Sequence, residues 1–200
     1  MKHYKWILRI MTCAVVLSAV WCTVTLTGVV AEERKIPIYS VERPDNKIAI
    51  SFDAAWGNEH TAAILSILEE YDVKTTFFLV DFWAKKFPED VKTIAAAGHE
   101  IGNHSATHPD LGKLSGAEIR RELETAGETI LQLTGVQPDL FRPPFGSYSN
   151  TLMDTAADCG YHVIQWSRDR PATAETHWNC KGRENLLYWY AATGNINELP

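Results

Sequence analysis

The chain has 200 residues, of which 46% are hydrophobic and 22% are charged. This is the composition of an ordinary globular protein, and it excludes a disordered or a fibrous chain. The formal net charge is −6 with neutral histidines. Because acidic residues outnumber basic ones, the composition also disfavours a nucleic-acid-binding protein.

The N-terminal residues 1–31 have the pattern of a targeting segment. Lys2, Lys5 and Arg9 provide a basic start, and the next 22 residues, 10–31, carry no charge. This apolar run is longer than a usual signal-peptide core of roughly 7–15 residues and long enough for a bilayer of roughly 30 Å. The pattern therefore indicates a signal peptide or an uncleaved membrane anchor, and both alternatives predict an extracytoplasmic protein, either secreted or membrane-anchored.

A polar segment separates this N-terminal stretch from the rest of the chain. Residues 32–46 contain two prolines and show no hydrophobic period. Such a composition predicts a linker. We therefore expect the folded domain to begin near Lys47.

Short apolar runs alternate with amphipathic segments in the expected domain, residues 47–167. Ser115 followed by Glu118 predicts a capping box at the start of the longest helix, and Gly135 predicts its end. Repeated strand and helix units predict an α/β fold with a parallel sheet or a β/α barrel, whose chemistry belongs at the carboxyl ends of the strands. The expected strands are 47–53, 75–80, 99–102, 140–142 and 161–166, and the expected helices are 61–71, 88–97, 115–134 and 151–158.

Three polar clusters follow these expected strands. Asp53 ends the first strand, His104 and His108 follow the third, and Arg142 ends the fourth. Taken singly, each has a structural explanation, as a turn residue, a chance spacing or a salt bridge. Together, an acidic group, an H-x-x-x-H pair and an arginine are the parts needed to bind a divalent metal, activate water and hold a base ionised.

The order and context of these clusters resemble the polysaccharide deacetylase family, which is the NodB-homology domain of carbohydrate esterase family 4. The resemblance covers residues 47–167. The form Ser-Phe-Asp-x-x-Trp-Gly of the first motif, after an N-terminal anchor, is similar to the sporulation-type peptidoglycan deacetylases. The three matching motifs are Ser51-Phe52-Asp53, His104-Ser105-Ala106-Thr107-His108 and Arg142-Pro143-Pro144-Phe145-Gly146.

This resemblance implies a distorted (β/α) barrel and a metal-dependent hydrolase. The enzyme would remove N-acetyl groups from N-acetylglucosamine or N-acetylmuramic acid residues of a cell-wall polysaccharide and release acetate. Asp53 would be the general base, and Arg142 would keep it ionised. His104 and His108 would bind the metal, for which zinc is expected first and cobalt or another divalent ion is the alternative.

The resemblance also indicates where the polysaccharide would bind. The turn of Pro144, Phe145 and Gly146 would supply a backbone N–H group for the oxyanion. Trp56 and Tyr148 would line a sugar groove, with partly buried packing as the alternative for each.

Two departures from the family pattern affect these expectations. Ala54 stands where the family usually has a second aspartate that ligates the metal, so a third ligand would have to come from Asn58, His60, Asp81 or another residue. Beyond Ser167 the family's aspartate-rich and Leu-x-His motifs are missing, and only Asp169 matches. Residues 168–200 are therefore an atypical tail, explained by a frameshift or truncation or by a divergent functional tail.

Both departures have consequences for fold and function. A barrel that lacks its last strands would be incomplete at the C-terminal end and would expose an unpaired strand edge. A site without the third ligand and the catalytic acid favours the alternative function, a catalytically impaired carbohydrate-binding pseudoenzyme.

Overall fold

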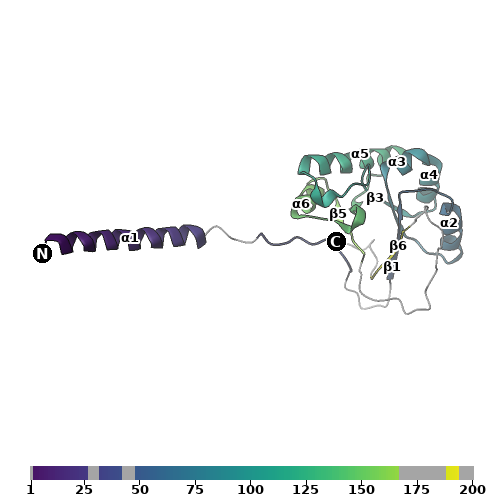
Figure 1. The fold of residues 1–200 in the computed structure, drawn as a ribbon. Helices are drawn as coiled ribbons and strands as arrows, with labels where there is room; N and C mark the ends of the chain where they lie inside the picture. The colour runs from purple at the N-terminus through teal and green to yellow at the C-terminus, as the bar shows by residue number, and fades with distance from the viewer. Residues whose placement is uncertain (1, 27–31, 42–47, 167–187, 194–200) are drawn as a thin grey trace. The chain divides into compact units, whose positions relative to one another are not determined.

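The computed structural model describes residues 2–26, 32–41, 48–166 and 188–193 (Figure 1). The chain divides between Arg34 and Lys35 into two compact units. The first unit contains one described helix, α1 (Lys2–Leu26). Among the described helices, none combines the length and the apolar character needed to cross a membrane. Whether the N-terminal segment is a signal or an anchor stays a prediction.

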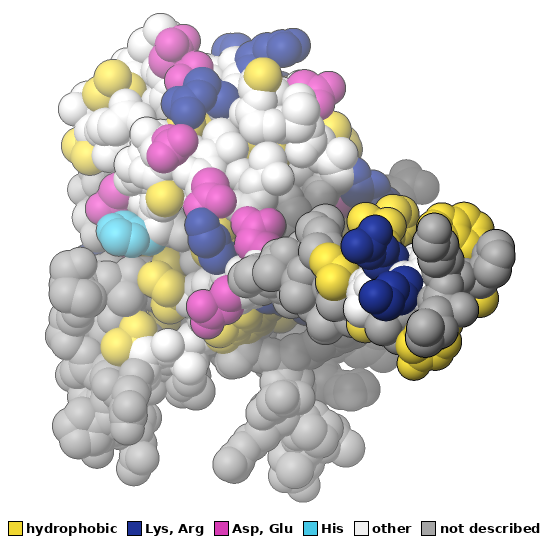
Figure 2. Space-filling model, turned by 90° about the vertical axis from the view of Figure 1, so that its left-hand side faces the viewer, with side chains coloured by type: hydrophobic (Ala, Val, Ile, Leu, Met, Phe, Trp, Pro, Cys, Tyr) yellow, Lys and Arg dark blue, Asp and Glu magenta, His cyan; other side chains and the backbone are white. Residues whose placement is uncertain are grey.

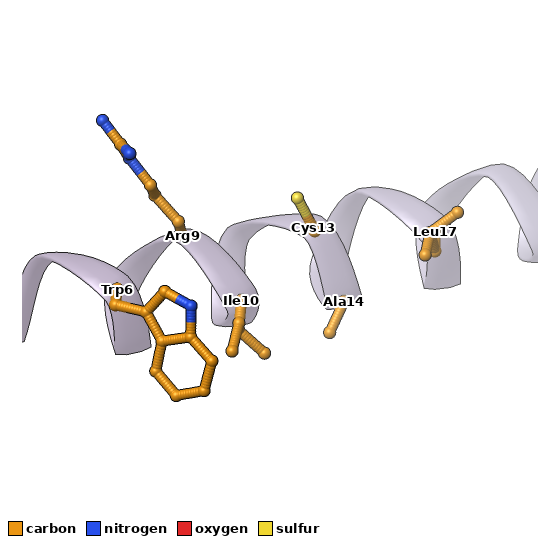
Figure 3. A pocket seen from close by; sticks show the side chains of 6 residues that line it. All are labelled: Trp6, Arg9, Ile10, Cys13, Ala14 and Leu17. Carbon is orange, nitrogen blue, oxygen red and sulfur yellow. The ribbon is translucent and has the colours of Figure 1, made fainter. Parts of the chain in front are cut away.

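A shallow hollow runs along α1 (Figure 3). Its lining comes from this helix alone, so it brings no residues of different elements together and is not a candidate functional site. The lining residues are Trp6, Arg9, Ile10, Cys13, Ala14 and Leu17.

The second unit is built on one sheet with the strand order β5-β4-β3-β2-β1-β6. Strands β1 to β5 pair in parallel and β6 pairs antiparallel with β1. The strands are β1 (Ile48–Ala54), β2 (Thr76–Leu79), β3 (Glu100–Asn103), β4 (Leu140–Phe141), β5 (His162–Val163) and β6 (Tyr188–Thr193).

Helical crossovers connect the parallel strands, as parallel pairing requires. The expected helices are confirmed, and the capping box of Ser115 and Glu118 and the left-handed Gly135 bound the longest of them. The six-residue α3 was not predicted, because fewer than two turns leave no readable period. The helices are α2 (Thr61–Glu70), α3 (Asp81–Lys86), α4 (Pro88–Ala96), α5 (Gly116–Thr134) and α6 (Asn150–Asp158), with short 3-10 helices at η1 (Leu111–Lys113) and η2 (Pro144–Gly146).

The sheet curls strongly. Three strand spacings of about 4.8 Å separate β1 from β4 in the strand order, or about 14 Å in a flat sheet. The long side chain of Arg142 reaches across these strands, so that its Nη1 lies 2.7 Å from Oδ1 of Asp53. A small core cluster also joins β1 to the segment after β5, the first and last of the parallel strands. It contains Ala49 of β1 and Ile164. This curvature agrees with the distorted barrel predicted from the sequence.

The helices cover the outer face of the curled sheet in two groups (Figure 1). One core cluster joins β1 and β2 to the helices that follow them and includes Phe77, Trp83 and Ile94. A second cluster joins β4 and β5 to α5 and α6 and includes Leu123 and Phe141. With the outer face packed in this way, the carboxyl ends of the strands are left to carry the polar clusters.

Part of the segment expected to be a linker belongs to the domain. Ile38 forms a parallel bridge with Ile164, and its backbone N–H and C=O bond to Val163 and Gln165. Lys35 N–H donates to Asn150 Oδ1 at 2.9 Å. Ile38 therefore adds a single bridge directly after β5, and Lys35 ties the same segment to α6. The sequence signal was missed because two prolines obscure so short a pairing segment.

The atypical tail contributes a strand that was not expected. Residues 188–193 form β6 and pair along β1 from Ile48 to Asp53. The expectation of an unpaired edge is therefore wrong at β1. The run Tyr-Trp-Tyr has the residue types of a strand, but it does not alternate with polar residues and gave no period. Asp169 and the rest of the tail lie outside the described residues.

Charged side chains of both signs are interspersed on the face of the molecule drawn in Figure 2. Mixed charges of this kind are typical of a solvated protein surface. That face therefore gives no sign of a strongly charged binding region among the described residues.

One close approach inside the sheet supports the site described below. Gly102 of β3 is paired with Phe78 of β2, and a Cβ atom at Gly102 would lie 2.5 Å from the Phe78 ring and 3.2 Å from the Leu140 carbonyl oxygen. Glycine is thus needed here to let the ring lie across the neighbouring strand.

We expect Gly102→Ala to lower the free energy of unfolding by about 1–3 kcal/mol, because the added methyl group overpacks the core. Urea unfolding followed by circular dichroism measures this loss. Combining it with Phe78→Leu, which shortens the opposing side chain, should recover part of the loss relative to the sum of the single variants. Additive effects would show that the clash is not with Phe78.

Candidate active site

A buried ion pair lies at the carboxyl end of β1. Arg142 Nη1 donates to Asp53 Oδ1 at 2.7 Å, and Nη2 donates to Ser51 Oγ at 2.7 Å. Arg142 is fully buried and Asp53 is 3% exposed. The guanidinium also lies over the Phe78 ring at 4.0 Å, as a cation–π contact. The two predicted catalytic residues therefore meet, and Arg142 is fixed from three directions.

His104 is hydrogen-bonded to the backbone of this pair through Nδ1, and its Nε2 lies near Asp53 without a hydrogen bond to it. Its Nδ1 lies 2.6 Å from the Arg142 carbonyl oxygen. That oxygen can only accept, so Nδ1 carries the hydrogen and Nε2 presents a lone pair. Nε2 lies 3.8 Å from Asp53 Oδ2. Burial lowers the pKa of His104, and the neighbouring Asp53 opposes this only in part. The imidazole is therefore neutral near pH 7 and able to bind a metal.

His108 faces His104 across the site, with ring centroids 5.1 Å apart. Partial burial and then the neighbouring His104 lower the pKa of His108. Two exposed aromatic rings flank it, Trp56 at 6.1 Å and Phe145 at 4.8 Å, both edge to face. The histidine pair therefore has one buried member and one member at the rim.

The third motif forms a tight turn beside the histidines. Phe145 has a φ of 59°, and its side chain is 69% exposed. Gly146 N–H donates to the Pro143 carbonyl at 3.3 Å, and Trp166 closes on Gly146 so that a Cβ atom there would lie 3.0 Å from the indole. The predicted Pro144–Gly146 turn therefore reaches the site, with its Gly146 N–H already engaged.

Tyr148, unlike the other predicted site residues, packs away from the histidine pair. Its side chain packs against the cluster around Leu111 and Leu152, and its hydroxyl lies 3.3 Å from that of Tyr39. These contacts favour the packing alternative that the sequence left open. Its part in a sugar groove stays a prediction.

The residues present supply two of the three protein ligands that a catalytic zinc site ordinarily has. His104 is neutral and its Nε2 is not bonded to the backbone, so it can ligate a metal together with His108. The suggested third ligands have other roles, since Asn58 donates to Asp90 at 2.6 Å, Asp81 binds Lys85 at 2.8 Å, and His60 is an exposed residue before α2. In the described ranges no three His, Cys, Asp or Glu side chains gather for a metal.

Two polar contacts of the site were not predicted. The contact of Arg142 with Ser51, a residue of the first motif, could have been found, because Ser51 is two residues before Asp53 and thus on the same face of β1. Glu122 of α5 accepts hydrogen bonds from Ala106 and Thr107, inside the second motif. Only the packing of α5 against the sheet brings it there, so no local sequence signal marks it.

The site combines a carboxylate paired with arginine, two neutral imidazoles and an exposed aromatic rim. All of them lie at the carboxyl ends of strands in a parallel sheet, which is the arrangement of a hydrolase-type site. Comparison with known proteins gives the class. The family profile described as "Polysaccharide deacetylase" matches residues 40–164. The chain belongs to the polysaccharide deacetylase family, whose members are in general metal-dependent.

Characterised relatives act on bacterial cell walls. A peptidoglycan-N-acetylglucosamine deacetylase of Bacillus cereus is 38% identical over 133 residues, which are 66% of this chain and 48% of the relative. The peptidoglycan-N-acetylmuramic acid deacetylase PdaA of Bacillus subtilis is 30% identical over 159 residues, 79% of this chain and 59% of the relative. The chain thus spans about half the length of these relatives.

A solved structure with the same fold has a different functional description. Wild-type BA3943 of Bacillus anthracis, a CE4 family pseudoenzyme, superposes with a TM-score of 0.64 at 37% identity, covering 66% of this chain and 47% of that one. A mutant of BA3943 is described as having restored enzymatic activity. Inactive and active forms of this fold therefore both exist among the relatives.

His99, outside the site, gives the domain a pH dependence. It is 6% exposed, its ring packs on Phe77, and its Nδ1 has no hydrogen-bond partner within the described part of the chain. Burial, and then the charge of Lys74, lower the pKa of His99 below 6.5. The side chain is thus part of the core packing, but its Nδ1 is not satisfied by the described residues.

We expect the free energy of unfolding to fall as the pH decreases through 6.5 toward the folded-state pKa of His99. In this window the unfolded chain takes up a proton that the folded one does not. His99→Leu should reduce the slope measured by urea unfolding between pH 7 and pH 5. An unchanged slope would assign the dependence to other groups.

Proposed function

We propose that this chain hydrolyses N-acetyl groups of a cell-wall polysaccharide, peptidoglycan in the first place, and releases acetate. The observation that carries the proposal is the buried Asp53–Arg142 pair with the neutral His104 and His108 beside it. The named relatives are peptidoglycan N-deacetylases, which supports N-acetylglucosamine or N-acetylmuramic acid residues as the substrate.

The residues divide the reaction between them. Asp53 accepts a proton from the attacking water, whose oxygen adds to the acetamide carbonyl carbon. The C–N bond then breaks, the amine takes up the proton that Asp53 accepted, and acetate and the ionised Asp53 remain. Arg142 holds the carboxylate in place through the reaction. A divalent cation on His104 and His108 would polarise the carbonyl and the water. We assign the backbone N–H of Phe145, in the turn of the third motif, as the hydrogen-bond donor to the developing oxyanion.

Trp56 and Phe145 are proposed to hold the sugar. They are 50% and 69% exposed, and both lie against His108, from different loops. Exposed aromatic rings pack on the apolar faces of sugar rings. Such a pair would place an acetamido group over the histidines.

The proposal is tested by acetate release from purified peptidoglycan in the presence of Zn²⁺ or Co²⁺. The wild-type chain should release acetate, and Asp53→Asn should lower the rate by about 10²–10⁴-fold because general-base catalysis is lost. Circular dichroism of the variant checks that the fold persists. Equal rates for the two proteins would disprove the role of Asp53.

A second candidate function, carbohydrate binding without catalysis, is favoured by one specific observation. Ala54 follows Asp53 on β1, is 1% exposed, and provides no metal ligand. BA3943, which shares this fold, is described as a pseudoenzyme. In this case the wild-type chain would bind peptidoglycan and release no acetate.

The variant Ala54→Asp tests whether the chain lacks only one metal ligand or lacks a metal site altogether. The new carboxylate would be buried, so without metal it should destabilise the fold by several kcal/mol, and bound zinc should relieve this. We expect Zn²⁺ to raise the melting temperature of Ala54→Asp more than that of wild type, as ligand binding to the native state requires. The uncharged Ala54→Asn is the control. An equal zinc response in all three proteins would exclude a site completed at this position.

We further propose that the domain works outside the cytoplasm, held or delivered by its N-terminal segment. The basic start at Lys5 and Arg9 and the exposed apolar side chains of α1, such as Trp6 and Leu17, support this. A role in sporulation rests on the form of the first motif. Fractionation of cells that express the full chain tests the location.

A further inference from the structure

We propose that Glu122 of α5 is the positioning residue for His108, and that it presets the second histidine of the site before any metal binds. The inference rests on the proposed function only in taking His108 as a metal ligand. Its basis is the conformation of the loop between the two histidines and the way in which α5 holds it.

The backbone of this loop has an unfavourable conformation. Ser105 has a φ of 73° and His108 a φ of 59°, so two non-glycine residues within four lie in the left-handed region. This conformation is unfavourable for residues with a Cβ atom, which crowds the following carbonyl oxygen. A loop of this kind keeps its shape only where surrounding contacts fix it.

Glu122 makes three contacts with the residues between the histidines. Its Oε2 accepts hydrogen bonds from the N–H groups of Ala106 at 2.9 Å and Thr107 at 2.8 Å, and its Oε1 accepts one from Thr107 Oγ1 at 2.8 Å. Hydrogen bonds to a carboxylate are stronger than neutral ones. One side chain thereby fixes two consecutive peptide groups directly before His108.

The start of the loop is fixed independently of Glu122. Asn103 Oδ1 accepts the Ser105 N–H at 2.8 Å, while its Nδ2 donates to the Leu123 carbonyl at 2.8 Å. His104 is buried and bonded to the backbone of Arg142. Loss of Glu122 would therefore leave His104 in place and release the far side of the loop.

His108 depends on that far side. Its N–H donates to Ser105 Oγ at 3.0 Å, which requires the loop to turn back on itself through Ala106 and Thr107. Its imidazole lies at the rim, half-buried, and is held by ring contacts more than by hydrogen bonds. Without Glu122, the Ala106 and Thr107 amides would turn to water and His108 would sample other directions.

The first experiment is Zn²⁺ titration calorimetry on the full chain. Glu122→Ala should bind zinc about 10–100-fold more weakly, the usual effect of removing a residue that orients a ligand. Glu122→Gln keeps an acceptor for the two amides and a partner for the threonine hydroxyl, so it should restore most of the affinity. Glu128→Ala, at an exposed glutamate of the same helix, is the matched control and should bind like wild type. Wild-type affinity in Glu122→Ala would overturn the proposal.

The second experiment needs no metal. Hydrogen exchange of the His108 amide, which Glu122 does not contact, should accelerate at least about tenfold in Glu122→Ala, since its protection reports the opening of the loop. The fully buried Phe78, in the sheet, provides the reference. Equal acceleration at Phe78 would mean general destabilisation and would overturn the proposal. If the wild-type chain binds no zinc, the metal-dependent function fails, and the exchange data still decide the role of Glu122.

Discussion

The structure depends on one buried ion pair that joins opposite sides of the curled sheet. Burying a carboxylate and a guanidinium costs several kcal/mol per ion, and the cost is offset only with good geometry and further hydrogen bonds. Arg142 has both, since it donates to Asp53 and to Ser51 and lies on the Phe78 ring. The ring can lie there because its neighbour on β3 is a glycine, Gly102.

This pair organises the rest of the site through the backbone of the same arginine. The Arg142 side chain holds Asp53, while its carbonyl oxygen sets the tautomer of His104. Asp53 and His104 are therefore oriented by one residue, deep in the domain. His108 is oriented from the opposite side, through a loop that α5 holds by Glu122. Two independent supports thus meet at the histidine pair, one buried and one near the surface.

The same arrangement explains how a polysaccharide deacetylase fold persists with an incomplete ligand set. The charges of Asp53 and Arg142 satisfy each other, so the fold does not require a metal to compensate a buried carboxylate. Ala54, where the family pattern usually has a second aspartate, is a small apolar side chain inside the core cluster of β1 and β2. An alanine at the position of the family's aspartate therefore fits the packing of the core, and the BA3943 proteins show that this fold occurs both as a pseudoenzyme and with restored activity.

Local sequence was enough to predict the parallel α/β architecture, the helix bounded by Ser115 and Gly135, and the side chains that gather at the site. These follow from local periodicity, caps and motifs, which are readable over a few residues. The sequence did not show that Ile38 pairs with Ile164, that residues 188–193 pair with β1, or that Glu122 reaches the loop between the histidines. Each of these depends on contacts between segments far apart in the chain, and only the curvature of the sheet and the packing of α5 decide them.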